Sequence, residues 1–190
     1  MMTNTMILKT MEKPRLSVKT QTLAAIAAVV GAVAVPQIFH ALGAAFGLGT
    51  MLGESFLPMH LPILLVGLLA GPYAGAAAGM FGPLVSFALS GMPGIAMLPF
   101  MMLELCVYGL TAGLLRNVKL PVVLKVLLVQ IAGRIIRAVA ILAAVYGLGS
   151  ESVPLASIWM SVGTGIYGIV LQWTLLPVIV RCVERMKNEE

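Results

Sequence analysis

Three polar residues interrupt an otherwise apolar stretch that runs from Val126 to Val145. They are Gln130, Arg134 and Arg137, and on a helix they fall within about 60° of one another on one face. A charged side chain in the middle of a membrane span costs about 2.5–3.5 kcal/mol on insertion scales, so such residues often mark a ligand site or pathway. A guanidinium can bind a carboxylate or phosphate through two parallel hydrogen bonds. The arginine face therefore predicts a site for a polar small molecule, and a buried structural network is the alternative.

Glu104 is the acidic residue that lies inside an apolar segment. Counted from the neighbouring loop, it lies at a depth of about 18 Å and Arg134 at about 20 Å in the next, antiparallel helix. The matched depth predicts an ion pair between Glu104 and Arg134. Arg137 lies one turn further out, without an acidic partner. We therefore expect Arg137, together with Gln130, to bind a carboxylate, a phosphate or carbonyl groups of a ligand.

Further candidate ligand contacts share helical spacing with Glu104 or flank the same end of the bundle. Tyr108 and Met101 follow the face of Glu104, where they either line a pocket or pack in the core. His60 begins an apolar segment and either contacts a ligand or bonds to backbone. Together with His40 it could ligate a metal, but a third clustered ligand is lacking, so no metal or other cofactor is predicted.

The composition indicates an integral membrane protein. Of the 190 residues, 60% are hydrophobic and only 10% are charged, with a mean hydropathy of +1.04. A soluble domain is about 45–50% apolar and about 25% charged. No nucleophile–base pair with recognisable spacing is present, which argues against an enzyme.

Six apolar segments of this chain can each cross a bilayer, which predicts an all-α protein with six transmembrane helices. We expect them at residues 20–39, 60–71, 73–89, 95–115, 121–146 and 154–180. The first resembles a signal peptide around Ala32-Val33-Ala34, but its apolar run continues past that point, so an uncleaved helix is favoured.

The basic residues predict the orientation of these helices. Ten of the twelve Lys and Arg residues fall on the side that holds both chain ends, and the other two are Arg134 and Arg137. Because Lys and Arg accumulate on the cytoplasmic side, both termini are expected there. The expected organisation is a cytoplasmic N-terminal segment (1–19), a membrane domain (20–182) and a cytoplasmic tail (183–190).

Small residues repeat every four positions on the first helix, at Ala24, Ala28 and Ala32. Such a stripe lets another helix approach closely. It can pack inside the bundle or dock another protein, and the pattern does not distinguish the two.

The chain resembles the substrate-binding S components of energy-coupling factor (ECF) vitamin transporters. The resemblance rests on the six-helix plan, on Ala24-x-x-x-Ala28 and on the stretch PMHLPILLVGLLAGPYAGAAAGMFGPLVSFALSGMP from Pro58 to Pro93. It implies a bacterial plasma-membrane subunit that binds a vitamin or related micronutrient from outside, under a lid formed by the first outer loop (residues 41–59).

The resemblance also implies partners. The stripe around Ala24 and Ala28 would dock on a membrane coupling subunit, and two ATPase subunits would hydrolyse ATP in place of this chain. The alternative is a self-sufficient channel or ion-coupled transporter, because buried charges also line ion paths.

Overall fold

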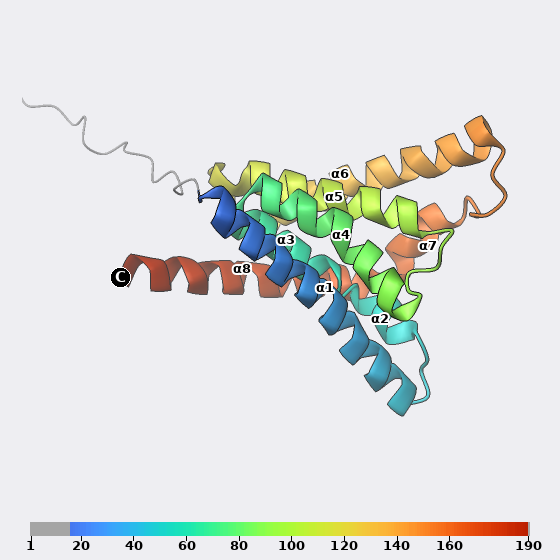
Figure 1. Cartoon of the computed structure of the whole chain (residues 1–190), viewed down its shortest axis with the longest axis horizontal. Coiled ribbons are helices and arrows are strands. Elements are labelled where there is room, and N and C mark those ends of the chain that lie inside the picture. Colours follow the sequence, from blue (N-terminus) through green and yellow to red (C-terminus); the bar gives the residue numbers. More distant parts are fainter. Residues whose placement is uncertain (1–15, 190) are drawn as a thin grey trace, which may run out of the picture.

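The structure is a computed structural model that describes residues 16–189, with side chains described up to residue 186. Most of the predicted N-terminal segment, including Lys9, Lys13 and Arg15, lies outside the described residues. The described chain is a bundle of helices that spreads apart at one end (Figure 1).

Helices make up all the regular structure of residues 16–189, as predicted. Six segments are long and apolar enough to cross a membrane, which makes this a multi-pass membrane protein. The α-helices are α1 (Val18–Ala45), α2 (Met51–Phe56), α3 (His60–Ala70), α4 (Pro72–Ser90), α5 (Leu98–Leu114), α6 (Val122–Leu142), α7 (Ser157–Thr164) and α8 (Ile166–Glu189), with short turns η1 (Leu115–Asn117) and η2 (Ala143–Gly147).

Two of the six spans differ from the prediction, because the second consists of two helices and the sixth, Ile166–Met186, begins only after a break at Gly165. The second span begins at Met51, since α2 and α3 together make one crossing segment, whereas the prediction began it near His60. The predicted sixth span is divided at Gly165 into α7 and α8. Both breaks lie at the same end of the bundle (Figure 1).

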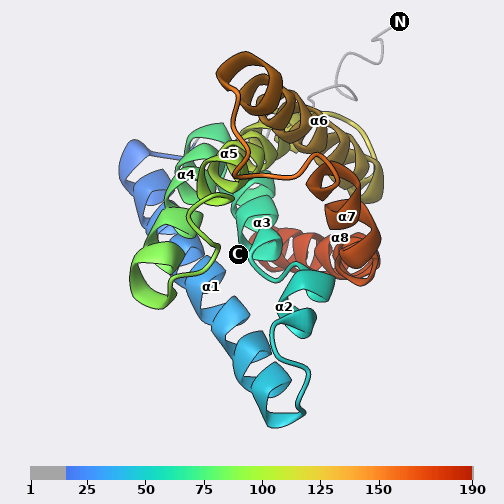
Figure 2. The same cartoon turned by 90° about the vertical axis from the view of Figure 1, so that its right-hand side faces the viewer.

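The short helix α3 is the centre of the bundle. It contacts α1, α4, α5 and α8, and Figure 2, viewed along the bundle, shows the other helices arranged around it. Seven of its eleven residues are buried, among them Ile63 and Leu64 at 0% exposure. Because α3 begins at His60, this residue lies where the central helix meets the spread end of the bundle.

Helices α4 and α5 are in backbone contact at paired glycines. A Cβ atom on Gly75 would lie 2.9 Å from Cα of Gly109, and one on Gly109 would lie 2.8 Å from Cα of Gly75. Glycine allows this approach because it has no side chain to separate the helices. The contact fixes the position of α5, and therefore of Glu104, relative to the rest of the bundle.

The basic residues gather at the end opposite the spread end. There, α1 begins and α8 ends (left in Figure 1). The turn at Gly71 lies within 3.7 Å, measured from a Cβ position, of both Gln21 on α1 and Arg116 on η1. Lys125 also donates to the carbonyl of Arg116. The start of α1, the Gly71 turn, the Arg116 turn and the end of α8 therefore lie at the same end of the bundle, which agrees with the prediction that the basic residues share one side.

The alanine stripe of α1 packs mainly into the bundle. Ala28 is 8% exposed and Ala32 is 0% exposed, and both belong to the hydrophobic core. Ala24 is partly buried and packs against that core. The docking surface implied by the resemblance is therefore partly occupied within this chain at Ala28, because the small side chains there admit α1 to the bundle.

Candidate functional site

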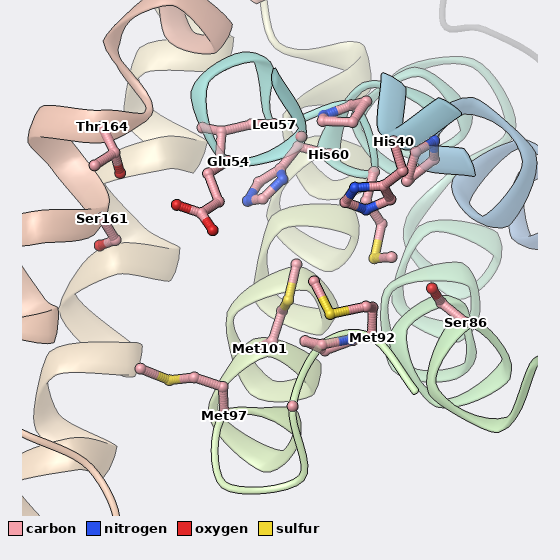
Figure 3. Close-up of a pocket in the computed structure, with 16 residues that line it drawn as sticks. His40, Glu54, Leu57, His60, Ser86, Met92, Met97, Met101, Ser161 and Thr164 are labelled. Atoms are coloured by element: carbon pink, nitrogen blue, oxygen red, sulfur yellow. The ribbon is translucent and has the colours of Figure 1, made fainter. Parts of the chain in front are cut away.

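A cavity of about 290 Å³ opens at the spread end of the bundle. Its walls come from α1, the α2–α3 corner, α4, the loop before α5, α5 itself and α7 (Figure 3). The walls are mostly apolar, with four methionines: Met59, Met92, Met97 and Met101. The polar side chains on the walls are His40, Glu54, His60, Ser86, Ser161 and Thr164.

The predicted lid contributes one wall and contains a helix. Helix α2 and the residues after it place Gly53, Glu54 and Leu57 on the cavity. The corner between α2 and α3 is held by Leu57, which has φ of +47°, a conformation that is strained for a branched side chain. It rests against the break between α7 and α8, where a Cβ atom on Gly165 would lie 2.7 Å from Cδ1 of Leu57.

Gly168 brings α8 against the same corner. A Cβ atom there would collide with the backbone carbonyl of Phe56 and lie 2.9 Å from Cβ of Leu57. Phe56 also contacts the ring of Tyr167, with centroids 6.2 Å apart. The residues of the predicted lid therefore pack into a notch on α7 and α8, and this notch exists because Gly165 and Gly168 carry no side chain.

We expect Gly168→Ala to displace the lid, because the carbonyl of Phe56 cannot yield without movement of the backbone. The measurement is the labelling rate of a thiol introduced by Met59→Cys, which is buried in the α2–α3 corner, after Cys106→Ala and Cys182→Ala remove the native thiols. Labelling should be several times faster with Gly168→Ala. Gly163→Ala is the matched control, because nothing lies within 4 Å of a Cβ atom at Gly163. Equal rates in all three proteins would show that the notch does not hold the lid.

The buried acid pairs with a different arginine from the one predicted. Oε2 of Glu104 lies 3.0 Å from Nη1 of Arg137, and their side chains are 1% and 16% exposed. The predicted Glu104–Arg134 pair is therefore wrong. So is the prediction that Arg137 has no acidic partner.

The error is about one helical turn. Arg134 and Arg137 are three residues apart on α6, which is about 4.5 Å along the helix axis. Depths counted along each helix do not give the offset of α5 and α6 along their axes, and a shift of one turn exchanges the two arginines.

Arg134 contacts a side chain of the cavity wall. Its Nη1 donates to Oγ of Ser161 over 3.4 Å, a long hydrogen bond, and Ser161 lines the cavity. Arg137 also approaches the wall, since its Nη2 lies 3.9 Å from Sδ of Met97. Both guanidinium groups therefore lie directly behind wall residues.

Tyr108 and His60 connect the ion pair to the cavity. Their rings meet edge to face with centroids 5.3 Å apart, and His60 lines the cavity. Tyr108 packs against Gly133 of α6, where a Cβ atom would collide with its ring. Tyr108 is 1% exposed and belongs to the core, whereas Met101 lies on the cavity wall.

Gln130 points away from this cavity. Its Nε2 donates to Oε1 of Gln172 over 2.8 Å, and its Oε1 accepts from Nε1 of Trp173 over 2.9 Å. Both groups of the amide are thus bound to α8, and Gln130 is not on the cavity wall. The predicted contact between Gln130 and a ligand does not agree with this arrangement, in which Gln130 holds α6 against α8.

Several wall residues were not predicted because they come from the broken sixth span. Ser161 and Thr164 face the cavity from α7. A continuous sixth helix would have hidden this surface, and Gly163 and Gly165 were the available signal for a break. His40 and His60 both line the cavity, but the described residues contain no group of three His, Cys, Asp or Glu side chains that could hold a metal ion.

The family model of the substrate-specific component of ECF transporters matches residues 18–180 of the chain. The chain belongs to this family. No curated protein and no solved structure matches it. As an ECF S component, it is a substrate-binding subunit of a membrane transporter. The cavity at the spread end, lined by the α2–α3 corner and by α7, is its candidate substrate site.

Proposed function

We propose that this S component binds a vitamin or related micronutrient with high affinity for uptake across the bacterial plasma membrane. The observation that carries the proposal is the cavity of about 290 Å³ at the end opposite the basic residues. Because Lys and Arg mark the cytoplasmic side, the cavity faces outward and receives substrate from outside the cell. Its size and mostly apolar wall with a few polar groups suit a small organic molecule.

The buried apolar residues between the cavity and the basic end of the bundle favour a binding subunit over a self-sufficient channel. Ile63, Leu64 and Leu105 are each 0% exposed and belong to the continuous hydrophobic core. A filled apolar core supports a closed site that needs partners to release the substrate. We propose that an ECF coupling subunit and two ATPase subunits are those partners.

The function is tested by native mass spectrometry of the purified chain and by uptake into vesicles. A bound organic micronutrient is expected in the spectrum. Uptake of that compound should require co-expression of the coupling subunit and the ATPases. Transport by the chain alone, or conduction of ions without a bound compound, would support the channel instead.

The docking part of the proposal is tested by a pair of alanines one turn apart. Ala24→Trp should abolish uptake while leaving substrate affinity in detergent unchanged, because Ala24 is only partly buried. Ala28→Trp should reduce both, because Ala28 is in the core. Equal loss of affinity in the two variants would show that the whole stripe serves internal packing.

A further inference from the structure

We infer that the substrate is a small organic acid and that Arg134 supplies the counter-charge for its carboxylate. This inference rests on the proposed function and names the chemical class of the substrate. It transfers the ligand contact first expected of Arg137 to the other arginine of α6.

Next to the buried Glu104, the two arginines of α6 outnumber the one carboxylate. Glu104 is committed to Arg137 at 3.0 Å. Within the described residues, no carboxylate lies within ion-pair distance of Arg134, and its hydrogen-bond partner is the neutral hydroxyl of Ser161. A charged group away from water is costly unless it is paired. A bound anion would provide that pairing.

The position of Arg134 makes such pairing possible. Ser161, which it contacts, lines the cavity, and Figure 3 shows Ser161 and Thr164 side by side on α7. The bond to Ser161 is 3.4 Å long and engages one nitrogen of a guanidinium that has five N–H donors. Arg134 is not itself a wall residue, so it supplies its charge from directly behind Ser161, and its remaining donors can make a two-pronged contact with a carboxylate when the side chain turns toward the cavity.

His60 provides a second, independent polar contact. It lines the cavity, is 4% exposed, and its Nδ1 has no hydrogen-bond partner among the described residues. Ser161, the hydrogen-bond partner of Arg134, lines the same cavity as His60. An acceptor on the substrate near Arg134 can therefore also receive a hydrogen bond from the imidazole.

The other wall residues indicate the chemistry of the part of the substrate that does not carry the carboxylate. Thioether side chains are flexible and make favourable contacts with aromatic rings, so the four methionines suit an apolar or aromatic body. The expected substrate is thus an acid whose apolar part is enclosed by methionines.

Glu54 offers a competing explanation for Arg134. It also lines the cavity, is exposed, and accepts a hydrogen bond from Thr50 on its own segment over 3.0 Å. If α2 moved inward, Glu54 could itself neutralise Arg134. Arg134 would then serve closure of the lid and not recognition of an acid.

The experiment compares vitamin acids with their carboxamides by isothermal titration of the full chain in detergent. The probes are nicotinate and nicotinamide, biotin and biotinamide, and lipoate and lipoamide, with neutral riboflavin and cationic thiamine added. We expect at least one acid to bind about tenfold or more tightly than its amide, the scale of a charge-assisted hydrogen bond. Arg134→Gln should remove that preference by weakening the acid alone, and Arg134→Lys should restore it only in part.

Glu54→Gln separates the two roles of Arg134. Unchanged or tighter binding of the acid supports the inference, whereas a loss equal to that of Arg134→Gln assigns Arg134 to the lid and overturns it. Equal binding of acid and amide also overturns it. Binding of riboflavin or thiamine alone refutes the acid while the proposed function stands. If no probe binds and native mass spectrometry finds no bound compound, the proposed function itself fails.

Discussion

Glu104→Gln is expected to lower the free energy of unfolding by about 3–5 kcal/mol, the range for removing one partner of a buried ion pair. The substitution keeps the size of the side chain but leaves the guanidinium of Arg137 without its counter-charge in a site where the acid is 1% exposed. The measurement is denaturant-induced unfolding in detergent, followed by circular dichroism.

Two further variants identify the partner of Glu104. Arg137→Gln should be destabilising on the same scale, and combining it with Glu104→Gln should cost less than the sum, because the double variant leaves no unpaired charge. Arg134→Gln is the control and should change stability little. If Arg134→Gln were instead the one coupled to Glu104, the ion pair described above would be wrong.

Gly109→Val should prevent stable packing of α5 on α4. A side chain at this position collides with the backbone of Gly75, which has no flexible end that can move aside. Forcing extra atoms into a close-packed contact costs about 1–3 kcal/mol and occasionally more. We place this variant at the upper end, because the two helices must separate along their length. Unfolding in detergent and the yield of folded protein both report the effect.

Gly163→Val is the matched control for the glycine contact. It also lies on a helix, but nothing lies within 4 Å of a Cβ atom there. Its effect should be within about 0.5 kcal/mol, as for most surface substitutions. If Gly109→Val were equally mild, the α4–α5 contact would not limit stability.

Much of the bundle could be predicted because its signals are long and repeated. The six apolar segments and the distribution of basic residues are each patterns that extend over many residues. The lid was expected in the first outer loop, and His60 and Met101 were expected near a ligand; both lie on the cavity wall.

The predictions that were wrong or incomplete depended on local details of one helical turn or on which helices are neighbours. The pairing of Glu104 depended on how α5 and α6 are offset along their axes, and hydropathy does not detect an offset of about one turn. The role of Gln130 depended on which neighbour α6 faces, and the partner Gln172 lies 42 residues away in the chain. Ser161 and Thr164 were missed because the break at Gly165 turns α7 toward the cavity.

The contrast between the two ends of the bundle has an evolutionary consequence. Toward the basic end, α4 and α5 touch backbone to backbone, so almost any larger residue in that contact is harmful. At the cavity, short helices and flexible methionines form the wall, and volume-conserving exchanges among such apolar residues are tolerated. Mutations that alter substrate preference can therefore accumulate around the cavity without loss of the fold. One scaffold can diversify toward new nutrients while its opposite end stays constant.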